Sequence, residues 1–157
     1  MQKYYKIVDA NLPFLTDYNM EDPTKVPLFK TFTAKSPETE YGLFIHSKTP
    51  VLHFCDNAFD TMLWYSTCVS HIEDAFVYEI KPIGNIIKEK CKDEHGLYQC
   101  GAPQIQFIKL VDTNEMFDLA LSEFEKDRMA KFRLYPDIGL SKITLSWLRH
   151  QKPTRIR

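Results

Sequence analysis

Short runs of alternating or continuous hydrophobic residues predict several β-strands in this chain. The runs are rich in β-branched and aromatic residues, which favour strands. They lie at Tyr4–Val8, Val26–Thr33, Gly42–Ser47, Ala75–Lys81 and Gln104–Val111. Gly42–Ser47 has no polar residue before His46, which indicates a strand that is buried on both faces.

Hydrophobic residues at three- and four-residue spacing predict helices over Asp56–Thr67 and from Asp112 to about Phe132. Asp56 or Asn57 can cap the first helix, and Asp112 with Glu115 has the spacing of a capping box for the second. A last short helix is predicted from Ser141 to Leu148. The hydrophobic stripe on each longer helix is expected to pack against the strands.

The segment after the strand at Ala75–Lys81 contains turn-forming residues. Pro82 limits pairing in a sheet, Gly84 permits a turn or bulge, and a short strand resumes at Ile86 and Ile87. The residues from Lys88 to Gly96 are highly charged and are predicted to form a loop.

These elements predict a single α+β domain over residues 1–157, since a chain of 157 residues is short enough for one hydrophobic core. We expect five or six mostly antiparallel strands, in one sheet or a split sheet. The 56–67 helix packs on one face, and two C-terminal helices lie at an end or on the other side.

The composition, 44% hydrophobic and 26% charged, is that of a soluble globular protein. No apolar run approaches the roughly 18 residues of a membrane span, and the first residues lack the pattern of a secretion signal. We therefore expect no membrane contact, a cytoplasmic location (the host cytoplasm if the protein is viral), and reduced thiols.

The net charge of −1 gives no overall field that would attract a nucleic acid. A basic tail is the local exception, because from Lys142 onward the chain has no acidic residue and carries four further cations: Arg149, Lys152, Arg155 and Arg157. Two interpretations stay open for residues 149–157: a solvated tail that balances the acidic 112–127 region, or a local contact with phosphate or nucleic acid.

Thiols and imidazoles occur at short spacings and raise the question of a zinc site. The candidate ligands form two sets: His53, Cys55, Cys68 and His71, or Cys91, His95 and Cys100. Zinc prefers four such ligands in a tetrahedron, usually supplied by closely spaced pairs. Because no Cys-x-x-Cys pair occurs, we do not expect zinc. A Gly-x-Ser-x-Gly elbow and a glycine-rich phosphate loop are also missing from the sequence.

Four segments in a fixed order resemble a known family. They are Gly42-Leu-Phe-Ile-His-Ser, a helix with Ala58 and Trp64-Tyr65, Phe76-Val-Tyr-Glu-Ile-Lys-Pro-Ile-Gly84, and Pro103-Gln-Ile-Gln-Phe-Ile. This order resembles the small mono-ADP-ribosyltransferases of the rifamycin-modifying type, and short phage-associated domains of similar layout. The resemblance covers about half of the chain, and it implies that NAD binds in the split between two small sheets.

The resemblance also implies roles for particular residues. Tyr4 or Tyr5 and His46 would contact the ribose, and Phe44 and Tyr65 would flank nicotinamide. The acidic residue past the Pro-x-Gly turn falls among Lys88, Glu89 and Asp93, and Glu89 would stabilise the positive charge that develops on the ribose.

The sequence departs from the family at two of these positions. Where the family has a histidine on its first strand, this chain offers Tyr4, Tyr5 and Lys6, and Phe44 stands where a tyrosine is expected. The alternative function is a non-catalytic binding or inhibitor protein, of viral or phage accessory type, that acts by contact with a protein partner.

Overall fold

The computed structural model describes residues 1–9, 23–34, 51–68, 75–90 and 97–135. The described strands form two antiparallel sheets. The four-stranded sheet has the order β1 (Tyr4–Asp9), β4 (Ala75–Ile83), β7 (Gln104–Val111), β2 (Thr31–Thr33). The three-stranded sheet has the order β3 (Leu52–Phe54), β6 (Tyr98–Ala102), β5 (Ile87–Lys90). The helices are α1 (Ala58–Cys68), α2 (Thr113–Lys126) and α3 (Arg128–Leu134), with a 3-10 turn η1 (Pro23–Lys25).

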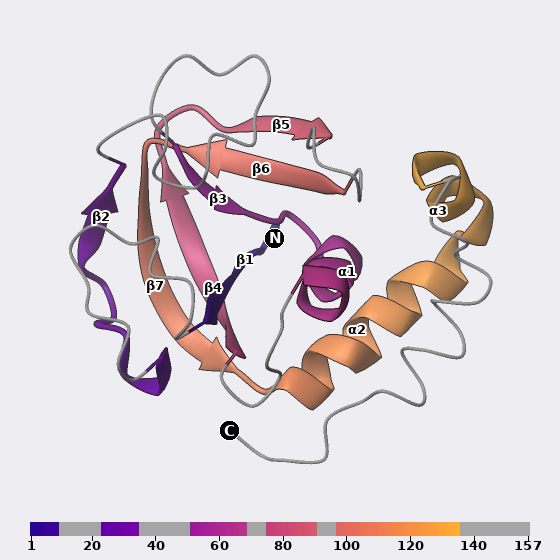
Figure 1. Ribbon diagram of the computed structural model, residues 1–157, viewed down its shortest axis with the longest axis horizontal. Helices are drawn as coiled ribbons and strands as arrows, with labels where there is room; N and C mark the ends of the chain where they lie inside the picture. Colours follow the sequence, from indigo (N-terminus) through magenta and orange to yellow (C-terminus); the bar gives the residue numbers. More distant parts are fainter. Residues whose placement is uncertain (10–22, 35–50, 69–74, 91–96, 136–157) are drawn as a thin grey trace.

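The two sheets meet where β1 passes β3 (Figure 1). The Tyr5 amide donates to the Cys55 carbonyl at 2.9 Å, and the Cys55 amide donates to the Tyr5 carbonyl at 2.8 Å. Among the described residues, this one bridge joins the two sheets. The predicted α+β fold with a split, mostly antiparallel sheet is confirmed.

Hydrophobic side chains fill the space between the sheets and the space under the helices. Phe32, Phe54 and Phe107 belong to the cluster that both sheets share. A second cluster lies between α1, α2 and the opposite face of the four-stranded sheet, where Met62 and Phe117 are buried. Figure 1 shows the resulting arrangement, with α1 and α2 to the right of that sheet and the three-stranded sheet above.

Local sequence signals place several elements correctly. The strands predicted at Tyr4–Val8, Ala75–Lys81 and Gln104–Val111 are confirmed as β1, β4 and β7. The first helix is also confirmed, and its cap is Asn57, whose Oδ1 accepts the Asp60 amide at 2.7 Å. Gly84 forms the predicted turn with a φ of 94°.

Three predicted boundaries are wrong. Only Thr31–Thr33 of the predicted Val26–Thr33 strand is a strand, because the backbone turns at Phe29, which has a φ of 62°. Lys88 to Lys90 belong to β5 rather than to a loop, since they pair with β6, a strand that the sequence pattern did not indicate.

The third boundary lies in the long C-terminal helix, which is broken at Asp127. This residue leaves the helical region with φ −152° and ψ 79°, and its carboxylate accepts the Ala130 amide at 3.0 Å to start α3. A residue that can cap a helix therefore ends one helix and begins the next. The predicted strand at 42–47 and the predicted helix at 141–148 lie outside the described residues.

Candidate functional site

One face of the three-stranded sheet gathers polar residues from three separate parts of the sequence. On β3 and β6, His53 pairs with Gly101, and Gly101 also pairs with Ile87 on β5. Two residues before Gly101 on β6, Gln99 pairs with Glu89 of β5. Because paired residues share a face and side chains repeat every two residues, His53, Gln99 and Glu89 lie on the same face.

The spacing on this face suits a ligand better than a direct contact. His53 and Glu89 are separated by two strand spacings and one two-residue step, which places their Cα atoms roughly 12 Å apart. Gly101 lies between His53 and Ile87 on this face and is itself buried. His53 is 3% exposed, whereas Glu89 and Gln99 are half-buried. A ligand that contacts both side chains would have to span this distance.

Lys6 approaches the same strand from the other side. It shares the face of β1 that carries Val8 in the core between the sheets, and it is only 6% exposed. Its ammonium donates to the main-chain carbonyl of His53 at 2.6 Å. A buried ammonium must be hydrogen-bonded to be tolerated, and this bond fixes the backbone of β3 at the residue whose side chain faces the candidate site.

A second polar cluster joins α1 to the end of α3. The Tyr135 hydroxyl donates to Oδ1 of Asp60 at 2.6 Å, and the Asn57 amide donates to Oδ2 at 2.9 Å. Lys88 donates to Asp56 at 3.0 Å, and its ammonium lies 3.9 Å from Asp60. Burial raises the pKa of the Asp60 carboxyl, although the hydrogen bonds from Tyr135 and Asn57 oppose that rise.

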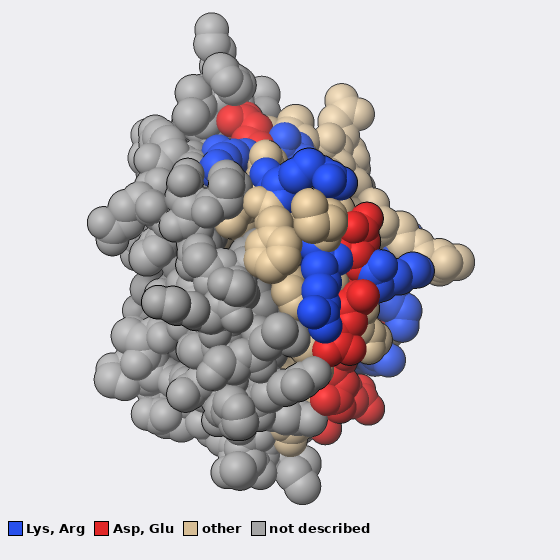
Figure 2. Space-filling view, turned by 90° about the vertical axis from the view of Figure 1, so that its right-hand side faces the viewer, with Lys and Arg blue, Asp and Glu red and all other residues tan. Residues whose placement is uncertain are grey.

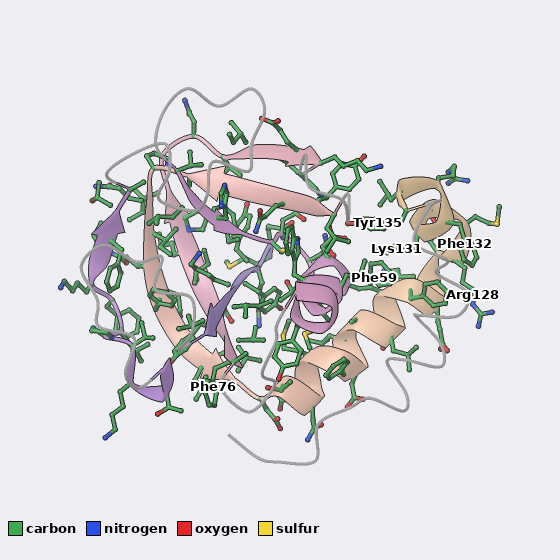
Figure 3. The ribbon with its side chains drawn as sticks, in the orientation of Figure 1. Phe59, Phe76, Arg128, Lys131, Phe132 and Tyr135 are labelled. Carbon is green, nitrogen blue, oxygen red and sulfur yellow. The ribbon has the colours of Figure 1, made fainter. Side chains whose placement is uncertain are left out.

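The contacts of this second cluster give it a structural role. Burial and the neighbouring Asp60 carboxylate raise the pKa of the Tyr135 phenol far above its usual value. The same hydroxyl accepts the Tyr98 amide at 3.3 Å, so its donor and acceptor functions are both used. Figure 3 shows Phe59, Lys131, Phe132 and Tyr135 gathered where the three helices meet. We therefore assign the Asp60 cluster to stability and keep the His53 face as the candidate site.

The tyrosines named from the sequence lie in different places. Tyr4 packs edge-on against Phe54, with ring centroids 5.5 Å apart, on the side of β1 that faces the other sheet. Tyr5 and Tyr65 lie on the opposite side, in the cluster under α1 and α2, and Tyr65 is 1% exposed against Phe117. The structure thus separates Tyr4 from Tyr5 and encloses the ring of Tyr65 among helix residues.

Of the remaining predicted residues, Glu89 is part of the site described above. Phe44 and His46 lie outside the described residues. Sequence reasoning did not identify His53 as a binding residue, because it considered this histidine only as a zinc ligand. A polar residue inside a buried apolar strand was the available signal, as it was for Lys6, but only the pairing of β3 with β6 and β5 relates His53 to Glu89.

Within the described ranges, no three side chains that bind metals come together. Cys55 and Cys100 are buried free thiols, and burial raises the pKa of both. Nothing is described for His71, Cys91 and His95, or for the side chain of Cys68. In the same ranges, no helix has the length and apolar character needed to cross a membrane.

Comparisons of this chain with protein-family models, with curated proteins and with solved structures find no match.

Proposed function

We propose that this chain is an ADP-ribosyltransferase-like, NAD-binding domain, with its ligand on the His53, Gln99 and Glu89 face of the three-stranded sheet. This face points away from the split between the two sheets, where the family resemblance puts NAD, because Phe32, Phe54 and Phe107 fill that split. The cross-strand register supports the proposal, because His53, Gln99 and Glu89 share one face of the three-stranded sheet. The family resemblance puts an acidic residue past the Pro-x-Gly turn among Lys88, Glu89 and Asp93, and Glu89 is our candidate there.

The chemistry requires a carboxylate near the ribose. In ADP-ribosyl transfer, the bond between C1′ of the ribose and the nicotinamide nitrogen breaks, and nicotinamide leaves with the electron pair. Positive charge then develops on the sugar, and the Glu89 carboxylate offsets it. A nucleophile of the acceptor forms the new bond to C1′ and loses its proton. The acceptor is a macromolecule or a small molecule.

In this proposal, the other residues either contact the ligand or hold a contacting residue in place. His53 and Gln99 offer hydrogen-bonding groups for ribose hydroxyls and the nicotinamide amide. Lys6 is a positioning residue that holds the His53 backbone. Phe44 and His46 remain predicted ligand contacts, whereas the buried positions of Tyr5 and Tyr65 favour a core role.

NAD binding tests the proposal directly. NAD at a hundredfold excess over its Kd should stabilise the native state by about 2.7 kcal/mol, which raises the melting temperature by several degrees. Gln99→Ala should reduce that shift, because it removes an amide from the proposed face. Gln106→Ala, a glutamine on β7 that donates to Thr31 at 2.9 Å, is the matched control and should keep the shift. No shift of the natural sequence at millimolar NAD would contradict the proposal.

One observation favours the second function, a non-catalytic binding protein. Phe29 is 66% exposed and Leu28 is 45% exposed, at a turn where Phe29 has a left-handed φ of 62°. A bulky residue is strained in this conformation, so an aromatic ring held outward there is a candidate contact for a protein partner.

The test compares two exposed apolar positions. Phe29→Asn should abolish copurification of a stoichiometric partner, because asparagine tolerates the turn but removes the ring. Met129→Asn, at a side chain that is 62% exposed, should retain the partner. Equal retention in both variants would argue against this turn as the contact.

A further inference from the structure

One face of the four-stranded sheet is covered by helices over only part of its length. Ala75 and Val77 of β4 and Val111 of β7 belong to the buried cluster under α1 and α2. Side chains on one face of a strand repeat every two residues. Glu79 and Lys81 therefore continue the same face of β4 beyond the part that the helices cover.

The strand register places further cations on this uncovered part. Lys109 pairs with Glu79, and Gln106 pairs with Lys81. Paired residues share a face. The Lys3 ammonium lies 3.7 Å from the Glu79 carboxylate, so Lys3 is on this side of the sheet too. We call the surface around Lys3, Lys81 and Lys109 the lysine face.

The lysine face is exposed and carries an excess of positive charge. Lys81 and Lys109 are exposed, and the Lys3 side chain is 55% exposed. Glu79 is the acid that the described strands place among these three lysines, which leaves a net charge of +2. Neither Lys81 nor Lys109 forms an ion pair with a described residue. Neighbouring like charges repel one another, so binding of an anion would relieve this repulsion.

The helical side of the molecule has a different distribution of charge. Figure 2 faces the side on which α2 and α3 lie, and basic and acidic side chains lie next to one another in its described surface. There α2 exposes Glu115, Asp118 and Glu125, and α3 exposes Arg128 and Arg133. Opposite charges weaken the local field on this side, whereas the lysine face keeps its excess.

The spacing of the three lysines suits a ligand with several negative charges. Continuing the register of β1 and β4 by one residue places Lys3 opposite Lys81. From the spacing of strands and residues in a sheet, the Cα atoms of Lys3 and Lys81 are about 5 Å apart, and those of Lys81 and Lys109 about 8 Å. A nucleic acid duplex carries one negative charge per about 1.7 Å of its axis. Three ammonium groups at these spacings can therefore contact separate phosphates of one duplex.

We propose that the lysine face binds the phosphate backbone of a nucleic acid duplex without reading its sequence. Gln106 and Thr31, joined by a hydrogen bond of 2.9 Å, add polar side chains of the kind that contact phosphate and sugar. Protein–protein interfaces are depleted in lysine and have an apolar centre. Here the aliphatic residue at the end of the face, Ile83, is half-buried, and a polar, positively charged surface is typical of contacts with nucleic acids.

The composition of the face also favours a duplex over a single strand. Proteins that bind single strands stack the bases on aromatic side chains. The described strands place lysine, glutamate, glutamine and threonine side chains on the lysine face, and no aromatic ring lies among these residues. Backbone charge is then the main attraction, and a duplex has the higher density of phosphates.

Fluorescence anisotropy with the full chain tests this proposal. The probes are a 20-base-pair DNA duplex, an RNA duplex of the corresponding sequence and one of the DNA strands alone, each titrated at several salt concentrations. The logarithm of the duplex affinity should fall linearly with the logarithm of the salt concentration, with a slope of about −3 for three phosphate contacts. At least one duplex should bind more tightly than the single strand.

Two sets of substitutions on the face should change the affinity in opposite directions. Lys3→Gln, Lys81→Gln and Lys109→Gln together should weaken duplex binding by about tenfold or more and reduce the slope by about 2 to 3. Glu79→Gln removes the negative charge among the lysines, so it should strengthen binding by roughly two- to threefold. A merely structural role of these residues would not produce a gain in affinity.

A second triple variant with the same change in charge is the matched control. It replaces three exposed lysines elsewhere, Lys30, Lys90 and Lys126, by glutamine. Lys90 is on the three-stranded sheet, Lys126 ends α2, and the Lys30 ammonium lies over the ring of Phe32, which faces the core between the sheets. This control should have a much smaller effect on the affinity and on the slope. Circular dichroism checks that every variant is folded.

Four results would overturn the proposal. They are no binding of either duplex by the natural sequence at low salt, tighter binding of the single strand than of both duplexes, equal losses in the two triple variants, and binding to vesicles containing phosphatidylserine without binding to a duplex. Because none of these measurements includes NAD, the outcome is independent of the proposed transferase function.

Discussion

Replacement of Tyr135 by phenylalanine should destabilise the protein strongly, although it removes only one oxygen atom. The hydroxyl donates to Asp60 at 2.6 Å and accepts from the Tyr98 amide at 3.3 Å. Tyr135 is 1% exposed and Asp60 is 2% exposed. Water therefore cannot replace the lost partner without a local opening of the structure.

The magnitude follows from the two hydrogen bonds. A bond to a buried charged group contributes about 1.5–3 kcal/mol, and an amide that loses a weak acceptor costs up to about 1 kcal/mol. We expect a loss of about 3 kcal/mol in the free energy of unfolding, which is a large share of the roughly 5–15 kcal/mol of a typical domain. The melting temperature should fall by about 6–12 °C.

The loss should depend on pH in a defined direction. Burial raises the folded pKa of Asp60 above its unfolded value, so its contribution to stability is greatest below the unfolded pKa of about 4 and decreases as pH rises through the folded pKa. The Tyr135 bond opposes that rise in pKa. Its removal raises the Asp60 pKa further, and the variant should be more destabilised at pH 7 than at pH 4.

Urea unfolding at the two pH values measures both effects. Tyr4→Phe is the matched control, since no hydrogen bond from the Tyr4 hydroxyl is seen among the described residues, and it should change the free energy by less than about 0.5 kcal/mol. A Tyr135→Phe loss below about 1 kcal/mol, or a loss that is greater at pH 4, would refute the structural role given to the Asp60 cluster.

Three further predictions concern other contacts. Glu123 accepts two amides that open α1, at 3.0 and 3.1 Å, so Glu123→Ala should cost about 2 kcal/mol in urea unfolding, and Glu123→Gln should cost less. Gly84→Ala should cost at least about 2 kcal/mol, because a methyl group there would lie 2.6 Å from the Pro103 ring at a φ of +94°; a neutral result would show that this turn is not rigid. Burial raises the pKa of the Cys100 thiol to about 12, so Cys100 and the buried Cys55 should resist alkylation at pH 8 until the chain unfolds; rapid labelling of the native protein in a mass spectrum would contradict this.

Short-range sequence patterns predicted three strands and the starts of two helices correctly. Strands β1, β4 and β7 are rich in β-branched and aromatic residues, and Asn57 and Asp112 supply oxygen atoms at the starts of α1 and α2. The strand propensity and the helix-capping hydrogen bonds of these elements depend on residues that are close together in the sequence. Short-range reasoning was sufficient there.

Elements that depend on distant partners were predicted poorly. Lys88 to Lys90 are a charged segment that becomes a strand only because β6 pairs with it. β6 itself contains Gly101, which weakens any strand signal. The relation between His53 and Glu89 arises from the same pairing, so the candidate site could not be assembled from spacing along the chain.

The most direct test of the proposed function is release of nicotinamide from NAD. The purified chain should release nicotinamide at a rate proportional to its concentration, measured by liquid chromatography, and Glu89→Gln should reduce that rate at least a hundredfold while NAD still raises the melting temperature. Glu115→Gln, an exposed glutamate on α2, is the matched control and should retain the full rate. An unchanged rate for Glu89→Gln, or no nicotinamide release by the natural sequence, would contradict the assignment of Glu89 as the catalytic carboxylate.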